Sequence, residues 1–203
     1  MSLDGYVAGP DPTLEDPLGK GGERLHEWAI GLESFKRIHG HEGGETGVDS
    51  DVLNEAFEHT GATIMGRKMF SGGSGGWEND PRANGWWGDE PPFRVKVFVL
   101  THHPRAQVEM RGGTSFIFVT DGFESALEQA RAAAEDQDVS VAGGAEVIQE
   151  ALALGCLDEI QVHVVPLLLG DGTRLFGEGQ LKRLKQARVI DSPAVTHIRY
   201  RVG

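Results

Sequence analysis

Three short stretches of the sequence place basic residues or bare glycines where predicted β-strands end. They are Gly66, Arg67 and Lys68; Thr101, His102 and His103; and Gly143 with Gly144. Open α/β sheets bind ligands beyond the carboxyl ends of their strands, where free backbone N–H groups attract phosphate. Two basic corners and one glycine turn therefore fit a dinucleotide, with its diphosphate at the glycines and an extra phosphate at the basic residues. The spacing is not G-x-G-x-x-G, so the usual dinucleotide-binding fingerprint is absent.

Each of these stretches also has a purely structural interpretation. The glycine pair would equally allow a helix to pack tightly on a strand, and the two histidines would equally be exposed loop residues. Arg67 and Lys68 would be the solvated start of a helix, although the helix dipole disfavours cations at that end. On the sequence alone both interpretations stay open.

The elements that must position these residues follow from the hydrophobic pattern. The predicted strands are the tail of a strand within 3–8, then 62–65, 96–101, 115–120, 139–142, 159–165, 184–190 and 196–202. The predicted helices are 23–32, a helix with Asp49 or Ser50 as its N-cap that ends at Thr60, the helix 123–136 with Asp121 as its cap, and 146–154. Alternating β and α units with a β-rich tail predict an α/β fold. Its central mixed, mostly parallel sheet would have flanking helices and an antiparallel C-terminal edge. We expect residues 1–203 to form one domain.

Residues 71–94 form a predicted loop that is long for a compact domain, and such loops are usually functional or mobile. The loop carries Trp77, Trp86 and Trp87 among glycines and prolines. These side chains would line a pocket for a flat heterocyclic substrate or form a dimer face.

Composition and charge exclude several classes of protein. The 203 residues are 39% hydrophobic and 25% charged, without an apolar run of the roughly 18 residues that a membrane span needs. The net charge of −12 disfavours nucleic acid as a partner. The single Cys156 excludes a disulfide and a cysteine-rich zinc site, and His39 and His41 lack further ligands at metal-binding spacing. We therefore expect a protein without a metal. Since the N-terminus does not look like a signal peptide, we also expect a cytoplasmic protein.

Five stretches occur in order over nearly the whole chain: "SLDGYVAG", "IMGRKMF", "VFVLTHHP", "VSVAGGAEVIQEAL" and "DEIQVHVVPLLLGDGTRLF". In this combination the sequence resembles the dihydrofolate-reductase-like superfamily, in the branch with the C-terminal reductase domain of the riboflavin-biosynthesis protein RibD. The resemblance implies a three-layer fold with an eight-stranded mixed sheet, and NADPH lying across the strand ends. It also implies a cis peptide bond within the pair 143–144, and it makes a homodimer an expectation.

The resemblance assigns cofactor-binding roles to particular residues. Those for the 2′-phosphate side of NADPH would be Gly66, Arg67, Lys68, Thr101, His102 and His103. Those for the diphosphate would be Ala142, Gly143, Gly144, Glu146 and Val147. Val7 and Ala8 would approach the nicotinamide.

The substrate side departs from the family pattern. Members that reduce the riboflavin pyrimidine typically have a lysine after "SLDG", where this chain has Tyr6. We expect substrate contacts from Asp4, Tyr6 and Trp77, although Asp4 would equally form a turn with the glycine that follows it. The family's first strand normally begins several residues before "SLDG", so we expect part of a central strand to be absent. One cysteine excludes the deaminase domain of RibD.

A dihydrofolate reductase needs a buried acid on its early helix to support protonation of its substrate. Asp49, Asp51 and Glu55 lie in the corresponding region, and Asp51 is the expected catalytic residue.

Together these features predict an NADPH-dependent reductase that passes hydride to a small flat heterocycle such as a pterin or a pyrimidine. The proton would come from Asp51 or from water. The first alternative is a nucleotide-binding protein on the same fold without turnover, which Tyr6 in place of lysine favours. The second is a structural or interaction role, with the tryptophan loop as an interface.

Overall fold

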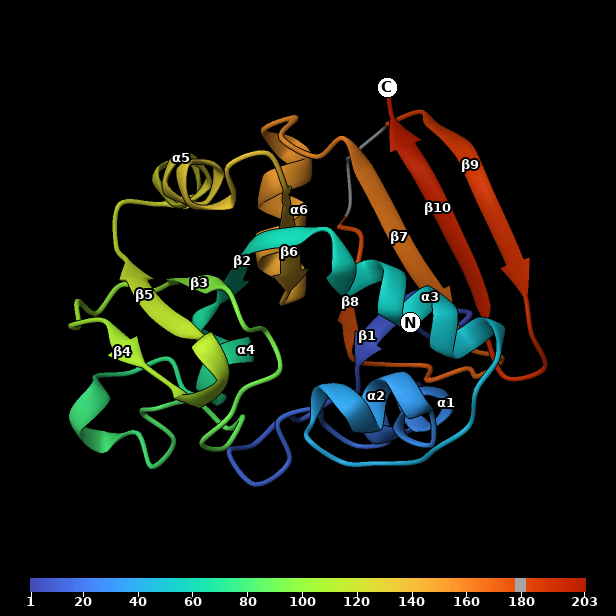
Figure 1. Ribbon diagram of the computed structural model, residues 1–203, viewed down its shortest axis with the longest axis horizontal. Coiled ribbons are helices and arrows are strands. Elements are labelled where there is room, and N and C mark those ends of the chain that lie inside the picture. Colours follow the sequence, from blue (N-terminus) through green and yellow to red (C-terminus); the bar gives the residue numbers. More distant parts are fainter. Residues whose placement is uncertain (178–181) are drawn as a thin grey trace.

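The largest sheet of the computed structural model, which describes residues 1–177 and 182–203, has five strands in the order β4-β5-β3-β2-β6. Its parallel strands are β2 (Thr60–Gly66), β3 (Lys96–Leu100), β5 (Ser115–Val119) and β6 (Asp138–Gly143), and the antiparallel edge strand is β4 (Val108–Glu109). Because parallel strands have their carboxyl ends at one edge, Gly66 pairs beside Leu100, and Met65 beside Gly143 (Figure 1). The three predicted binding stretches follow these strand ends directly.

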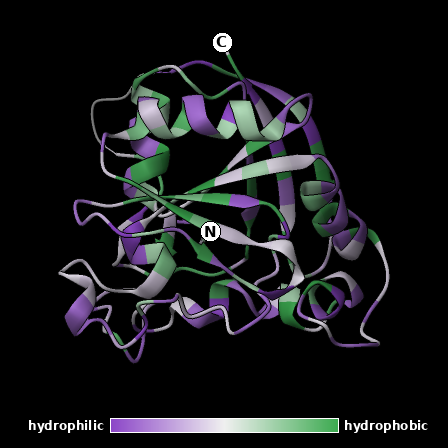
Figure 2. Cartoon of the chain, turned by 60° about the vertical axis from the view of Figure 1, so that its left-hand side comes forward, coloured by the Kyte–Doolittle hydropathy of each residue, from purple (hydrophilic) through white to green (hydrophobic). Residues whose placement is uncertain are grey.

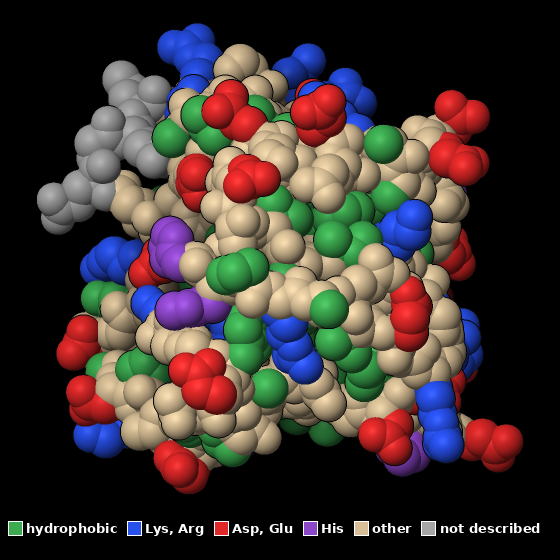
Figure 3. Space-filling model, turned by 90° about the vertical axis from the view of Figure 1, so that its left-hand side faces the viewer, with side chains coloured by type: hydrophobic (Ala, Val, Ile, Leu, Met, Phe, Trp, Pro, Cys, Tyr) green, Lys and Arg blue, Asp and Glu red, His purple; other side chains and the backbone are tan. Residues whose placement is uncertain are grey.

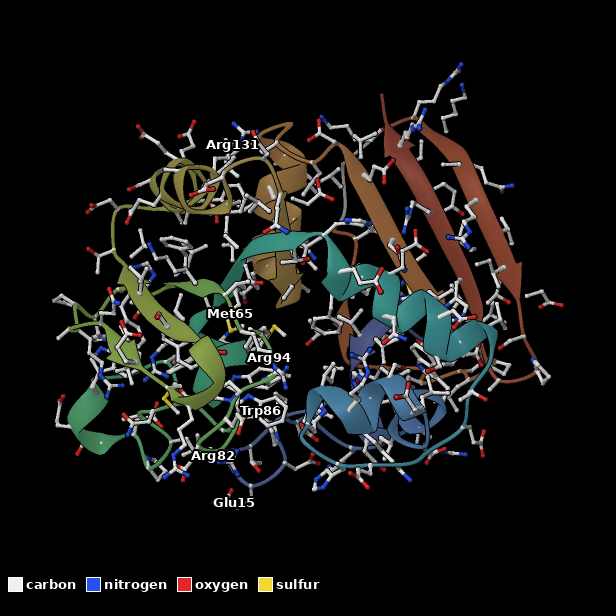
Figure 4. The ribbon with its side chains drawn as sticks, in the orientation of Figure 1. Glu15, Met65, Arg82, Trp86, Arg94 and Arg131 are labelled. Atoms are coloured by element: carbon white, nitrogen blue, oxygen red, sulfur yellow. The ribbon has the colours of Figure 1, made fainter. Side chains whose placement is uncertain are left out.

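Helices and the long predicted loop cover the two faces of this sheet. The helical elements are η1 (Gly22–Leu25), α1 (Glu27–Ile30), α2 (Glu33–Ile38), α3 (Val48–Glu58), α4 (Arg67–Ser71), η2 (Trp77–Asn79), η3 (Arg111–Gly113), α5 (Phe123–Ala134) and α6 (Ala145–Ala153). Ile64 packs with α5 and α6 on one face, whereas its neighbour Met65 packs on the other with α4 and the segment 71–94. Arg131 and Trp86, on opposite sides of the sheet in Figure 4, mark these two layers. The strands between them are mainly hydrophobic (Figure 2).

A second, antiparallel sheet of three strands has the order β7-β10-β9. Its strands are β7 (Glu159–Val164), β10 (Thr196–Val202) and β9 (Leu184–Asp191). Ile160 and Val162 of β7 pack in an apolar cluster with Leu152 of α6. On β10, His197 and Arg199 hydrogen-bond side chains of α3, so α3 covers a polar face of this sheet.

The N-terminal segment connects with the end of β7. Ser2 bridges Val165 in parallel, and the backbone N–H of Leu3 donates to the carbonyl of Leu167 at 2.8 Å. β1 (Tyr6–Ala8) then pairs antiparallel with β8 (Thr173–Arg174). These strands approach closely at Gly172, which has φ +129 and where a Cβ would collide with the backbone oxygen of Ala8.

The predicted α/β fold class is confirmed, with a mixed sheet, flanking helices and antiparallel C-terminal strands. In place of the single eight-stranded sheet that the resemblance implied, the described residues form ten strands in hydrogen-bonded sets of five, three and two, and β6 does not pair with β7 among them. The predicted helix 23–32 is broken into η1 and α1 at His26. Within the described part of the chain, no helix is both long and apolar enough to cross a membrane.

Two predicted helix caps are wrong. The N-cap residues are Gly47 before α3 and Gly122 before α5, and neither helix has a side-chain cap hydrogen bond. Both glycines have positive φ, and they lie one to three residues away from the predicted caps. Asp49, inside the first turn of α3, bonds instead to His197 and Ser192.

Candidate functional site

The joint between β6 and α6 is bare backbone beside open space. The Gly143–Gly144 peptide bond is cis, as the resemblance implied. Gly143 has φ +131, and a Cβ built on the exposed Gly144 meets no atom within 4 Å. Tight packing of a neighbour therefore does not explain the second glycine. The backbone at this joint is accessible to a ligand.

Gly66 brings the end of β2 against this joint. A Cβ at Gly66 would lie 3.0 Å from Cγ2 of Val147 and 3.6 Å from the backbone nitrogen of Gly144. The structure thus brings these three predicted residues together. At the neighbouring strand end Thr101 is buried, and its hydroxyl accepts the N–H of His103 at 3.1 Å, so it shapes the turn.

Arg67 does not project from the strand end as a free cation. Its side chain is only 7% exposed, and Nη2 donates to Oδ2 of Asp80 at 2.5 Å. Nη1 donates to the hydroxyl of Ser71, while the buried Nε has no partner. Asp80, itself 4% exposed, also accepts from Ser71 at 2.7 Å and from the N–H of Arg82 at 2.8 Å. These hydrogen bonds lower the pKa of Asp80 although burial opposes them.

Trp77 completes this cluster from the segment 71–94. The Cζ atom of Arg67 lies 3.6 Å from the centre of the indole, and that of Arg105 lies 5.0 Å from it. The indole N–H donates to the carbonyl of His103 at 2.8 Å. Trp77 therefore joins the segment 71–94 to the end of β3. Its indole serves as a packing and anchoring group in this arrangement.

Lys68, which follows Arg67 at the end of β2, also has an acidic partner. Lys68 lies 3.2 Å from Glu146 of α6, and both side chains are largely exposed. The charges of both signs are interspersed on the surface that faces the viewer in Figure 3. The open glycine joint thus fits the diphosphate of a dinucleotide, whereas Arg67 and Lys68, predicted for a 2′-phosphate, are each paired with a carboxylate.

The residues predicted for the substrate side are held by hydrogen bonds around β1. Asp4 accepts the N–H groups of Leu169 and Gly170 at 3.1 and 2.7 Å, and a hydrogen bond with Ser2 further lowers its pKa to about 2. Tyr6 is buried, and its hydroxyl accepts from the exposed Arg174 at 3.0 Å. The guanidinium of Arg174 also lies 4.5 Å from the centre of the Tyr6 ring. Asp4 thus acts as a turn former here.

The structure separates the acidic residues of α3. Asp51 is exposed, whereas Asp49 lies toward the sheet and accepts from Nε2 of His197 at 2.9 Å. Nδ1 of His197 lies 2.6 Å from Nδ1 of His163 on β7. The carbonyl of His163 accepts from the terminal ammonium of Met1 at 2.5 Å, which places this chain of groups beside the segment leading into β1. Burial, together with the charges of His197 and the terminal ammonium, lowers the pKa of His163 to about 4.

Sequence analysis did not single out His163 or His197. Alternation along 159–164 and 196–202 does place both on the same side of paired strands, and that pattern was the available signal. Trp28 packs against both imidazoles, with ring centres at 5.1 and 5.2 Å.

A hollow of about 400 Å³ lies next to the Arg67 cluster. It is lined by residues 12–14 and 72–76 together with Asn79 and Asp80. Gly73 is required there, because a Cβ would lie 2.7 Å from Oδ2 of Asp80. The hollow thus places the segment 9–22 opposite the glycine-rich stretch that precedes Trp77.

The chain has a mixed α/β fold whose open glycine joint lies at the ends of its parallel strands. The family model for the RibD C-terminal domain matches residues 1–197, and the chain belongs to this family. No curated protein sequence matched the chain.

Solved structures show the same fold. A putative riboflavin biosynthesis protein from Shewanella sp. PV-4 superposes with a TM-score of 0.64 at 19% identity, covering 100% of this chain and 95% of the other. A diaminohydroxyphosphoribosylaminopyrimidine deaminase/5-amino-6-(5-phosphoribosylamino)uracil reductase from Thermotoga maritima gives 0.53 at 16%, covering 100% of this chain and 54% of its own. The riboflavin biosynthesis reductase of Saccharomyces cerevisiae gives 0.51 at 12%, covering 78% and 82%.

Proposed function

We propose that this chain is a reductase that transfers hydride from NADPH to a small flat heterocycle of the pterin or pyrimidine type. The observation that carries the proposal is the open glycine joint at the ends of β2 and β6, in a chain of the RibD C-terminal domain family. The similar proteins from Thermotoga maritima and Saccharomyces cerevisiae are described as reductases, which supports the reaction class. We also propose that the chain forms a homodimer, as the resemblance implies, and that it is cytoplasmic.

The cofactor would supply the hydride, and this chain's residues would bind, orient and protonate. Backbone N–H groups at Gly144 and the start of α6 would hold the diphosphate, while Val7 and Ala8 of β1 would lie along the nicotinamide. Asp51 was the expected proton donor, but its exposed position on α3 gives it no contact with the sheet. We propose Asp49 instead, because its carboxylate faces β10, where it accepts from Nε2 of His197 and would pass on a proton received from that imidazole.

A nucleotide-binding protein without turnover is the second candidate. It is favoured by Asp4 and Tyr6, whose polar atoms are used in hydrogen bonds within the protein. The two candidates share the nucleotide site and differ in turnover.

The first experiment is a titration of the purified protein with NADPH, followed by nicotinamide fluorescence. We expect saturable binding that Gly144→Val weakens at least about tenfold, because a branched side chain would fill the open space at the joint. The control is Ala153→Val, at the far end of α6. The nearby Gly155 is not used as a control position because its φ of +69 would strain any side chain. Absence of binding by the unchanged protein would refute the proposal.

Turnover is tested next with a panel of pterins and pyrimidines, following oxidation of NADPH. We expect Asp49→Asn to lower kcat by at least about tenfold and to leave the Kd of NADPH within about twofold, since general acids contribute on that scale or above. Asp51→Asn is the matched control and should keep kcat. Binding of NADPH with no oxidation by any member of the panel would favour the second candidate.

A further inference from the structure

Asp80 forms an ion pair with Arg67, the cation that the 2′-phosphate of NADPH would require. Arg67 follows β2 at the basic corner, yet its guanidinium is 7% exposed and lies 2.5 Å from the carboxylate of Asp80. While its guanidinium is held by the Asp80 carboxylate, Arg67 is not free to turn toward a phosphate outside the protein. The charge of Arg67 is also neutralised within the cluster.

The packing around this ion pair is built to hold it. Ser71 hydrogen-bonds both partners, and Trp77 lies against the guanidinium at 3.6 Å. Gly73 leaves the space that the Asp80 carboxylate fills, since a Cβ there would come within 2.7 Å of Oδ2. The segment 71–94 therefore supplies the anion, the ring and the bare backbone that together enclose Arg67.

The other charges of the corner do not replace Arg67. Lys68 is paired with Glu146, and exposed pairs of this kind contribute little energy. Arg105 donates to the carbonyl of Ala83 and, at 2.6 Å, to the side chain of Asn84. The corner therefore offers a phosphate dianion no buried cation without a partner among the residues that the structure describes.

Resting on the proposed reductase function, we infer that Asp80 is a specificity-determining residue that withdraws Arg67 from the 2′-phosphate and leaves NADPH and NADH bound with similar affinity. The inference concerns the choice between the two nucleotides and is separate from whether either is bound. Asp80 acts on this choice through Arg67, without touching the nucleotide.

The test compares Kd values for NADPH and NADH by nicotinamide fluorescence in four proteins. The unchanged protein should bind both within about threefold of each other. Asp80→Asn keeps the size of the side chain and removes its charge, and should tighten NADPH at least about tenfold while NADH stays within about twofold. The double variant Asp80→Asn/Arg67→Met should lose this gain. Asp11→Asn, the same change on the exposed Lys20–Asp11 ion pair, should alter the ratio by less than about twofold.

Unchanged NADH affinity in Asp80→Asn shows that the variant is folded. If the unchanged protein binds NADPH more than tenfold more tightly than NADH, the inference is overturned and the proposed function still stands. This outcome does not depend on whether Asp80→Asn folds. A gain that persists in the double variant, or an equal gain in Asp11→Asn, would also overturn it. Binding of neither nucleotide by the unchanged protein or by Asp80→Asn would overturn both the inference and the proposed function.

Discussion

The hydrogen-bonded chain of Asp49, His197 and His163 determines which imidazole nitrogens carry protons. An ionised carboxylate only accepts, so Nε2 of His197 donates to Asp49. One proton lies between Nδ1 of His197 and Nδ1 of His163, which are 2.6 Å apart. A second proton on His163 would put a charge on a buried imidazole beside His197 and the terminal ammonium of Met1. Burial first, and these neighbouring charges second, explain why His163 resists protonation.

This resistance predicts a pH dependence of stability. The pKa of His163 is lowered from 6.5 to about 4 in the folded protein, so between these values the unfolded chain binds more protons. The contribution of neutral His163 to the free energy of unfolding is fully present above pH 6.5 and is lost as the pH falls toward 4. We expect the free energy of unfolding to decrease by roughly 2 kcal/mol between pH 7 and 4.5 through His163. Urea denaturation at a series of pH values measures this.

His163→Asn is the matched variant for this measurement, because its amide N–H can still donate toward His197 without titrating. The loss of stability between pH 7 and 4.5 should be smaller in the variant by about the same 2 kcal/mol. An identical loss in both proteins would assign the pH dependence to other groups.

At the scale of elements, the contact between β2 and α5 depends on a residue without a side chain. A Cβ on Gly61 would lie 2.8 Å from both Cα and the backbone oxygen of Ala134, so helix and strand would have to separate. We expect Gly61→Ala to lower the free energy of unfolding by about 1–3 kcal/mol. Gly75→Ala is the control, since a Cβ there meets nothing within 4 Å, and it should change stability by less than about 0.5 kcal/mol. Equal effects in urea denaturation would contradict this account.

Most elements could be predicted from the sequence because each carries a local pattern. The alternation in 196–202 and the apolar run in 96–100 are readable without any neighbour. β4 and β8, of two residues each, were not predicted, because so short a pairing exists only through its partner strand. The caps of α3 and α5 were missed for a related reason, since glycines with positive φ set both helix starts.

At the scale of the whole molecule, the site is assembled from segments far apart in the chain. The glycine joint, Gly66 and the family itself could be predicted, because each rests on residues close in sequence or on motifs in order. The ion-pair partners of Arg67 and Lys68 could not be predicted, since Asp80 is 13 positions from Arg67 and Glu146 is 78 positions from Lys68. Asp49 meets His197 only because α3 packs on β10, 148 positions away. The sequence shows charges, and only the packed structure shows which of them are already paired.

Net charge gives a prediction for the molecule as a whole. With the cations of the corner paired locally, the overall charge of −12 dominates the field that an anionic nucleotide meets. Screening that field should favour binding, so we expect the Kd of NADPH to fall about twofold between roughly 20 and 150 mM salt. Titration at several salt concentrations measures this. A Kd that rises with salt would instead indicate free cations at the site.

The positions of the tryptophans give the protein two separate optical reporters. Trp28 lies against two imidazoles, and protonated imidazole quenches indole emission, so its signal should follow acid conditions. Trp77, between the guanidinium of Arg67 and the end of β3, should instead respond when a nucleotide that absorbs its emission lies across the strand ends. Replacing Trp28 with phenylalanine would leave the emission of Trp77 together with that of Trp86 and Trp87, so that ligand binding could be followed by light without any attached dye.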